Sequence, residues 1–167
     1  RERHEVPGQT LDLVAADADR LGAAIPQADG SWRRLSGDEI GWLFADHILA
    51  NTTGDERLVV TTLVSSSLLA QMAAAAGVHS EETLTGFKWI GKIASERPDL
   101  RLVLGYEQAL GYLVAQRPLD KDGISAAVLM AEMRTCANTT RRKALLRRSA
   151  RLPMASDKGL PGPADVA

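Results

Sequence analysis

The stretch that decides the fold is Leu58-Val-Val-Thr-Thr-Leu-Val-Ser-Ser-Ser-Leu-Leu-Ala-Gln-Met-Ala-Ala-Ala-Ala-Gly77. Residues 58–64 are mostly apolar and β-branched, which predicts a buried strand. Residues 65–76 are rich in alanine and predict a helix that ends at Gly77. A buried strand that runs directly into a helix is typical of an α/β layered domain.

The alternation of strands and helices continues toward the C-terminus. The predicted elements are, in order, a strand at 78–84, a helix from Thr85-Gly86 to about Ser95, strands at 100–104 and 112–115 around a loop at 105–111, and a helix that begins at Asp120-Lys-Asp-Gly123. On this last helix we expect an inward face made of Ile124, Ala127, Val128 and Ala131.

The N-terminal part also predicts short strands followed by a helix. Residues 11–16 predict a strand, and residues 21–26 and 32–35 flank Gln27-Ala-Asp-Gly30, which predicts a β-hairpin. Ser36 and Glu39 have the spacing of a capping box and therefore predict a helix start. The expected buried face of that helix is Ile40, Leu43, Phe44, His47 and Ile48, with His47 as a packed histidine and not a ligand.

Composition excludes several classes of protein. The 167 residues are 45% hydrophobic and carry a net charge of −1, which is typical of a soluble globular chain. No apolar run is long enough to span a bilayer, and the first residues do not form a secretory signal, so no membrane partner is expected. The single Cys136 excludes an intrachain disulfide and favours a cytoplasmic location.

Charge is unevenly distributed along the chain. Residues 134–167 hold eight Lys/Arg and two Asp, so 20 − 8 = 12 basic and 21 − 2 = 19 acidic residues remain in 1–133. The basic segment lacks interleaved aromatic residues and is rich in Gly and Pro toward its end, which predicts a poorly ordered tail. Nucleic-acid binding through 141–151 would rest on charge alone and is not expected.

The segment Asp17-Ala-Asp-Arg20 follows the first predicted strand. Carboxylates at alternating positions of a loop can converge on Mg²⁺, and the adjacent Arg20 could bind a phosphate oxygen. A third carboxylate would fall at position 15, where the chain has Ala15. A solvated Asx-rich turn is the alternative interpretation.

Six segments stand in an order and spacing that resemble the α-D-phosphohexomutases, the phosphoglucomutase/phosphomannomutase enzymes, and especially their bacterial members. They are Asp17-Ala-Asp-Arg-Leu-Gly22, Ser36-Gly-Asp-Glu-Ile-Gly41, Thr61-Thr-Leu-Val-Ser-Ser66, Thr83-Leu-Thr-Gly-Phe-Lys-Trp-Ile-Gly91, Gly105-Tyr-Glu-Gln-Ala-Leu-Gly-Tyr112 and Asp120-Lys-Asp-Gly-Ile-Ser-Ala126. The resemblance implies layered mixed sheets flanked by helices. With the polar break at 51–56, it implies an incomplete domain two at 1–54 and a near-complete domain three at 57–133. It ends after Met133, so 134–167 is expected to be a basic, poorly ordered tail, from either a changed reading frame or an unrelated terminus.

The family resemblance also implies a reaction. A phosphoserine, with Mg²⁺ bound to it, exchanges its phosphoryl group with a hexose phosphate through a bisphosphorylated sugar, which interconverts hexose 1- and 6-phosphates. Carried over by position, Asp17 and Asp19 match metal ligands and Arg20 a phosphate contact. The implied sugar contacts are Thr85, Gly86, Lys88, Glu107 and Ala109, the last at a position where some members use serine.

The departures from the family pattern limit what this chain is expected to do. Ala15 removes one metal ligand and should weaken Mg²⁺ binding. The phosphoserine loop and the fourth domain's phosphate-binding motif are not found, so no catalytic residue is assigned and no turnover by the chain alone is expected. Two hypotheses remain, a part of a mutase and a non-catalytic remnant that binds phosphosugars or a protein. An incomplete first domain should expose apolar surface and favour self-association.

Overall fold

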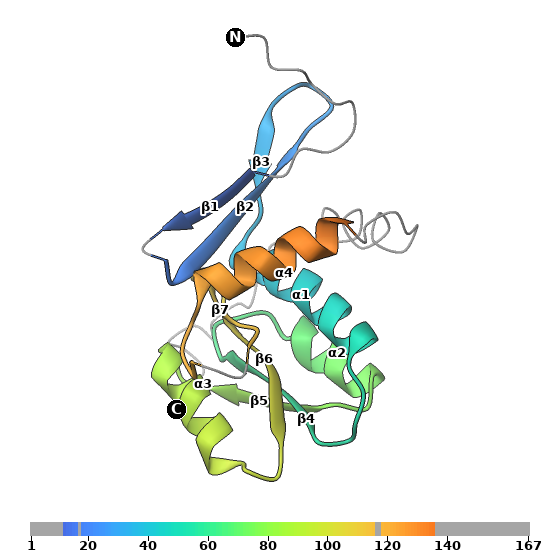
Figure 1. The fold of residues 1–167 in the computed structure, drawn as a ribbon, viewed down its shortest axis with the longest axis vertical. Helices are drawn as coiled ribbons and strands as arrows, with labels where there is room; N and C mark the ends of the chain where they lie inside the picture. The colour runs from blue at the N-terminus through green and yellow to red at the C-terminus, as the bar shows by residue number, and fades with distance from the viewer. Residues whose placement is uncertain (1–11, 17, 116–117, 136–167) are drawn as a thin grey trace, which may run out of the picture. The chain divides into compact units, whose positions relative to one another are not determined.

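The computed structural model describes residues 12–16, 18–115 and 118–135. The secondary-structure elements are β1 (Asp12–Ala16), β2 (Arg20–Pro26), β3 (Trp32–Arg34), α1 (Gly37–Asn51), β4 (Arg57–Thr62), α2 (Leu68–Ala75), β5 (His79–Thr83), α3 (Phe87–Glu96), β6 (Arg101–Glu107), β7 (Gly111–Leu113) and α4 (Gly123–Thr135) (Figure 1). The expected poorly ordered tail lies outside the described residues from position 136 onward. None of the described helices is both long and apolar enough to cross a membrane.

The seven strands of the described residues belong to one mixed sheet, in the order β1-β2-β7-β6-β4-β5. β3 pairs with the end of β2, through residues 24–26, on the edge opposite β1. β4 is parallel to both β5 and β6, and the other strand pairs are antiparallel. The predicted α/β class, with a mixed sheet flanked by helices, is confirmed. The strands expected to form two separate layers nevertheless share one sheet, because Arg20 of β2 pairs with Gly111 of β7. The division into domains at 51–56 stays a prediction.

Helices cover both faces of the sheet and create two hydrophobic clusters. The larger cluster places Val59, Leu104 and Tyr106 against α1, α2 and α4, and the smaller one places Leu58 and Val60 against Phe87 and Ile90 of α3. Successive residues of β4 therefore point to opposite cores, as the pleat of a strand requires. This arrangement explains why β4 reads as a continuous apolar run.

The start of α1 follows the sequence prediction closely. The Ser36 side chain accepts a hydrogen bond from the Glu39 backbone N–H at 3.2 Å, and the Glu39 carboxylate accepts from the Ser36 N–H at 2.8 Å. Glu39 also forms a 2.8 Å ion pair with Arg33. His47 is buried, with its Nε2 3.5 Å from Glu132 Oε1. The capping box and the packed histidine are confirmed.

Two sequence predictions need correction. β6 continues to Glu107, three residues beyond the predicted end, so the loop shortens to 108–110. On α4 the predicted inward face is wrong for Ile124 and Val128, which are 63% and 64% exposed, and for the exposed Ala131, whereas Ala127 packs against the core. The inward residues are Ala126, Met130 and Met133. At Gly123 the start of α4 lies against the backbone of β2, since a Cβ there would lie 2.6 Å from the Arg20 carbonyl oxygen.

Exposed apolar side chains occur in both halves of the described chain. They are Trp32, Leu63, Val64, Leu84, Leu119, Ile124 and Val128. These residues are compatible with the expected self-association, which stays a prediction.

Arg57 is a buried cation that joins the ends of two helices. Its Nε and Nη1 donate to the carbonyls of Gly54 at 2.8 Å, Thr52 at 2.9 Å and Leu49 at 3.3 Å. Its Nη2 donates to the Ala76 carbonyl at 3.3 Å. Carbonyls at helix C-termini lack partners within the helix. One guanidinium therefore satisfies carbonyl groups at the ends of α1 and α2.

Replacing this guanidinium should destabilise the fold. We expect Arg57→Met to lower the free energy of unfolding by about 2–3 kcal/mol, because buried carbonyls lose a charged donor. Urea denaturation followed by circular dichroism measures the change. Arg101→Met is the matched control, since Arg101 is half-buried and pairs with Glu56 at the surface. Its expected loss is below about 1 kcal/mol, and equal losses in the two variants would contradict the role of Arg57.

Candidate active site

The candidate site lies where three strands of the sheet are adjacent. Arg20 of β2 pairs with Gly111 of β7, and Gly111 pairs in turn with Glu107 of β6. Directly opposite residues of antiparallel strands share one face of the sheet. The register therefore puts Arg20 and Glu107 on the same face, roughly 10 Å apart at two strand spacings, with a glycine between them.

Glu107 is held by the segment that precedes α3. Its Oε1 accepts a hydrogen bond from the backbone N–H of Gly86 at 2.8 Å. Gly86 has a φ of +115°, a conformation that favours glycine, and it immediately precedes the first residue of α3. A carboxylate at a helix N-terminus interacts favourably with the helix dipole. Within the described part of the chain, no hydrogen bond involves the second carboxylate oxygen of Glu107.

Lys121 crosses the space above Gly111. A Cβ at position 111 would lie 3.2 Å from Lys121 Cδ and 3.3 Å from a ring carbon of Phe87. The ammonium of Lys121 reaches Asp19, with 3.2 Å between Nζ and Oδ2. The segment Asp120-Lys-Asp-Gly123 predicted a helix start and belonged to the family resemblance, but no site role was predicted for Lys121. Its position in a segment shared with the mutase family was the available signal.

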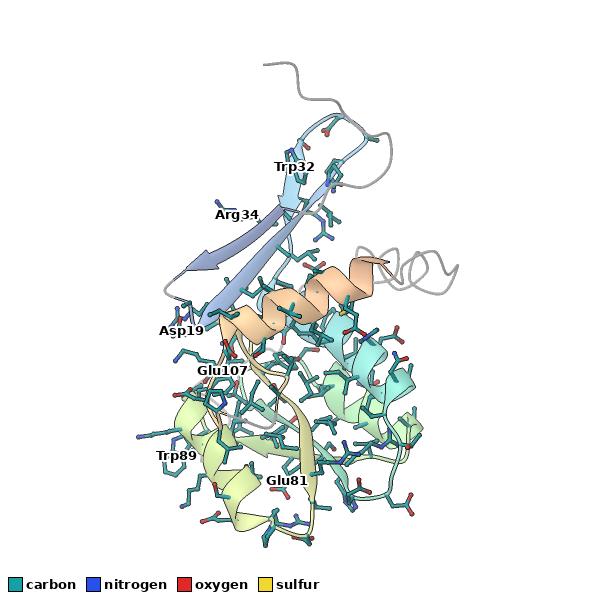
Figure 2. All side chains as sticks on the ribbon, in the orientation of Figure 1. Asp19, Trp32, Arg34, Glu81, Trp89 and Glu107 are labelled. Atoms are coloured by element: carbon teal, nitrogen blue, oxygen red, sulfur yellow. The ribbon has the colours of Figure 1, made fainter. Side chains whose placement is uncertain are left out.

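The loop between β1 and β2 is held by the first residue of α4. The Gly123 N–H donates to the Ala18 carbonyl at 3.0 Å, and Ala18 has a left-handed φ of +59°. Figure 2 shows Asp19 at the tip of this hairpin and Glu107 at the end of β6, on the same side of the view. The backbone of α4 thus keeps the Asp19 loop next to β7.

The predicted metal ligands are Asp17 and Asp19. Asp17 lies outside the described residues, and the side chain of Asp19 faces Lys121. The described residues contain no group of three His, Cys, Asp or Glu side chains that could hold a metal ion. Because Asp17 was not among the residues searched, the predicted pair of Asp17 and Asp19 as Mg²⁺ ligands stays a prediction.

The remaining predicted contacts are exposed. Thr85 and Lys88 flank Gly86, and Ala109 lies in the turn between β6 and β7. The Lys88 ammonium lies 5.2 Å from the centroid of the Trp89 ring, within the range of a cation–π interaction. Of the five predicted sugar contacts, a hydrogen bond between described residues joins Gly86 and Glu107.

Comparison with known proteins agrees with this arrangement. A family profile described as phosphoglucomutase/phosphomannomutase, alpha/beta/alpha domain III, matches residues 36–150. A Haemophilus influenzae protein named "Probable phosphomannomutase" is 42% identical over 118 residues, which cover 70% of this chain and 23% of that protein. Mouse phosphopentomutase is 41% identical over 127 residues, covering 70% of this chain and 20% of that protein. Yeast phosphoribomutase is 36% identical over 145 residues, which cover 78% of this chain and 22% of that protein.

Solved structures show the same fold at lower sequence identity. A phosphoglucomutase/phosphomannomutase family protein from Burkholderia thailandensis superposes with a TM-score of 0.65 and 18% identity, over 86% of this chain and 29% of that one. N-acetylphosphoglucosamine mutase from Aspergillus fumigatus superposes with a TM-score of 0.59 and 18% identity. The match covers 87% of this chain and 36% of that one.

The chain spans about a fifth of the length of the curated relatives it matches. The family profile covers well over half of the chain and coincides with α1 through α4. The chain therefore belongs to the phosphoglucomutase/phosphomannomutase family and contains its α/β/α domain III.

Proposed function

We propose that this chain is the sugar-binding part of a phosphosugar mutase, with Glu107 as the residue that binds the sugar hydroxyls. The hydrogen bond from Gly86 to one carboxylate oxygen supports this role, because it orients the carboxylate before any sugar arrives. An ionised carboxylate can accept hydrogen bonds from two hydroxyl groups side by side. Such an orientation reduces the entropy that binding would otherwise cost.

Arg20 is the proposed phosphate contact. It stands across Gly111 from Glu107, and its exposed guanidinium matches the geometry of phosphate oxygens. A sugar phosphate carries hydroxyls at one end and a dianion at the other. A fixed carboxylate and a guanidinium on one face of the sheet, two strands apart, complement that molecule. Thr85, Lys88 and Ala109 are proposed as further contacts at its edge.

The reaction proposed for the whole enzyme is phosphoryl transfer between a phosphoserine and the sugar, through a bisphosphorylated intermediate. The residues of this chain would supply binding and orientation of the sugar, which lower the barrier by positioning the reacting oxygen. The names of the relatives include mannose, pentose and ribose mutases. The proposed substrate is therefore an aldose phosphate, a hexose phosphate or a pentose phosphate.

The proposed role of this chain in sugar binding does not depend on Mg²⁺. The family resemblance implies a Mg²⁺ ion on the phosphoserine, but Ala15 offers no ligand and Asp19 is paired with Lys121. These two observations also favour the second candidate function, a non-catalytic remnant that retains sugar-phosphate binding.

The role of Glu107 can be tested with a single isosteric change. We expect Glu107→Gln to weaken binding of sugar phosphate about tenfold, because the amide keeps the Gly86 hydrogen bond but replaces an acceptor oxygen with a donor. Calorimetric titration with glucose 1-phosphate, mannose 1-phosphate and ribose 1-phosphate measures the change and identifies the sugar class. The control is Glu82→Gln, an exposed carboxylate of β5. Unchanged affinity in Glu107→Gln would rule out Glu107 as the sugar ligand.

Position 15 can be tested by restoring the missing carboxylate. We expect Ala15→Asp to bind Mg²⁺ at least about tenfold more tightly than the native chain, since each carboxylate adds an oxygen ligand and a charge. Calorimetric titration with MgCl₂ measures both affinities, with Ala50→Asp, an exposed position of α1, as the control for added charge. Equal affinities of the native chain and Ala15→Asp would show that position 15 is not a ligand.

The purified chain is expected to bind sugar phosphate without converting it. The proposed residues supply sugar binding and not the phosphoryl group, and catalysis requires both in one place. A coupled assay that detects glucose 6-phosphate formed from glucose 1-phosphate measures turnover. Activity that is lost when a serine of this chain is replaced would contradict the proposed division of roles.

A further inference from the structure

The turn that follows Glu107 is held by hydrogen bonds between Gln108 and a buried serine, Ser65. Ser65 lies in the turn between β4 and α2 and is only 6% exposed. Its hydroxyl oxygen is 2.9 Å from Thr62 Oγ1, 3.3 Å from the Gln108 backbone nitrogen and 3.4 Å from Gln108 Oε1. A hydroxyl has one donor and two acceptor sites. These contacts use all three, with Gln108 as both donor and acceptor.

Asp38 anchors the residue on the other side of Glu107. Its Oδ1 accepts hydrogen bonds from the Tyr106 hydroxyl and from the Ser66 backbone N–H, both at 2.9 Å. Burial, and then the charge of Asp38, raise the pKa of Tyr106 well above its ordinary value. The phenol therefore stays protonated and keeps donating to Asp38 throughout the neutral range. Asp38 thus connects α1, the β4–α2 turn and the end of β6.

The start of α1 can approach this region because its first two turns carry Gly37 and Gly41. A Cβ at Gly37 would lie 2.0 Å from the Gln108 carbonyl oxygen, and a Cβ at Gly41 would lie 2.8 Å from the Tyr106 ring. The backbone of α1 therefore lies directly against both neighbours of Glu107. The segment Ser36-Gly-Asp-Glu-Ile-Gly41 combines a helix cap with this close contact.

We propose that Ser65 and Asp38 are positioning residues of the sugar site, which hold Glu107 in place through Gln108 and Tyr106. Neither residue contacts the sugar in this proposal. Since Glu107 stands between two anchored residues, its carboxylate is directed toward Gly86 without depending on a bound ligand. The inference deepens the proposed function and rests on Glu107 being the sugar ligand.

Two serines of one turn provide a matched test of this role. Ser65 is buried and fully hydrogen-bonded, whereas Ser67 is exposed and its side chain makes no capping hydrogen bond to α2. In Ser65→Ala we expect the Gln108 amide to exchange with solvent at least about tenfold faster, because its acceptor is removed. Amide exchange followed by NMR measures this, with Val59 and Val60 of β4 as internal references for global opening. Ser67→Ala should leave the Gln108 amide unchanged.

Asp38 is tested by comparing two substitutions. Asp38→Asn keeps an oxygen that can accept both hydrogen bonds, whereas Asp38→Ala removes it. We expect Asp38→Ala to shift the NMR amide signals of Glu107 and Gly86 and to weaken sugar-phosphate binding about tenfold. Asp38→Asn should retain most of the native signal positions and affinity. A merely structural role would lower the melting temperature without this selective rescue at the site.

The outcomes separate the two proposals. Faster exchange at Gln108 together with weaker binding of glucose, mannose or ribose 1-phosphate in Ser65→Ala supports the positioning role. Native exchange at Gln108, or native affinity despite faster exchange, overturns it. If the native chain binds none of the three sugar phosphates, the proposed function fails, whereas faster exchange in Ser65→Ala still establishes that Ser65 holds the turn.

Discussion

The candidate site depends on one glycine in the middle of a three-strand register. Gly111 pairs with Arg20 on one side and with Glu107 on the other, and it is the point at which the N-terminal hairpin joins the rest of the sheet. A side chain at this position would contact Lys121 and Phe87. Without a glycine at this position, Lys121 and Phe87 could not lie so close to the backbone of β7. The same residue therefore joins the hairpin to the sheet and admits these two side chains between Arg20 and Glu107.

A second constraint acts from the opposite direction, through the first turn of α1. The carboxylate of Asp38 collects hydrogen bonds from two elements that are far apart in sequence, the turn after β4 and the end of β6. Charged acceptors make stronger hydrogen bonds than neutral ones, and more so where water is largely excluded. The helix that caps itself with Ser36 and Glu39 thereby becomes a rigid support for Glu107. Residues 36–41 therefore contain the cap of α1, the Asp38 carboxylate and the two glycines that lie against the neighbours of Glu107.

Local patterns predicted more of this structure than long-range contacts did. The capping box, the hairpin at 21–35 and the strand–helix alternation depend on residues a few positions apart, and all of them appear in the structure. The inward face of α4 was mispredicted because α4 packs against β2, a strand about a hundred residues away in sequence, and local periodicity does not contain that contact. Lys121 was missed for a similar reason, since only the fold brings it to Asp19. The family resemblance placed Gly86 and Glu107 in one sugar site, but the sequence did not predict the hydrogen bond between them.

Two features are expected to oppose Mg²⁺ binding by the predicted loop, the ion pair between Lys121 and Asp19 and the alanine at position 15. The Lys121 ammonium lies beside Asp19, but the two side chains are 24% and 38% exposed. Ion pairs between partly exposed groups contribute at most about 1 kcal/mol, so a divalent cation could displace the lysine at small cost. A missing carboxylate is a greater loss, because Mg²⁺ requires short bonds to oxygen in a nearly octahedral arrangement. For the predicted Mg²⁺ loop of Asp17 and Asp19, we therefore expect Ala15 to weaken metal binding more than the ion pair between Lys121 and Asp19 does.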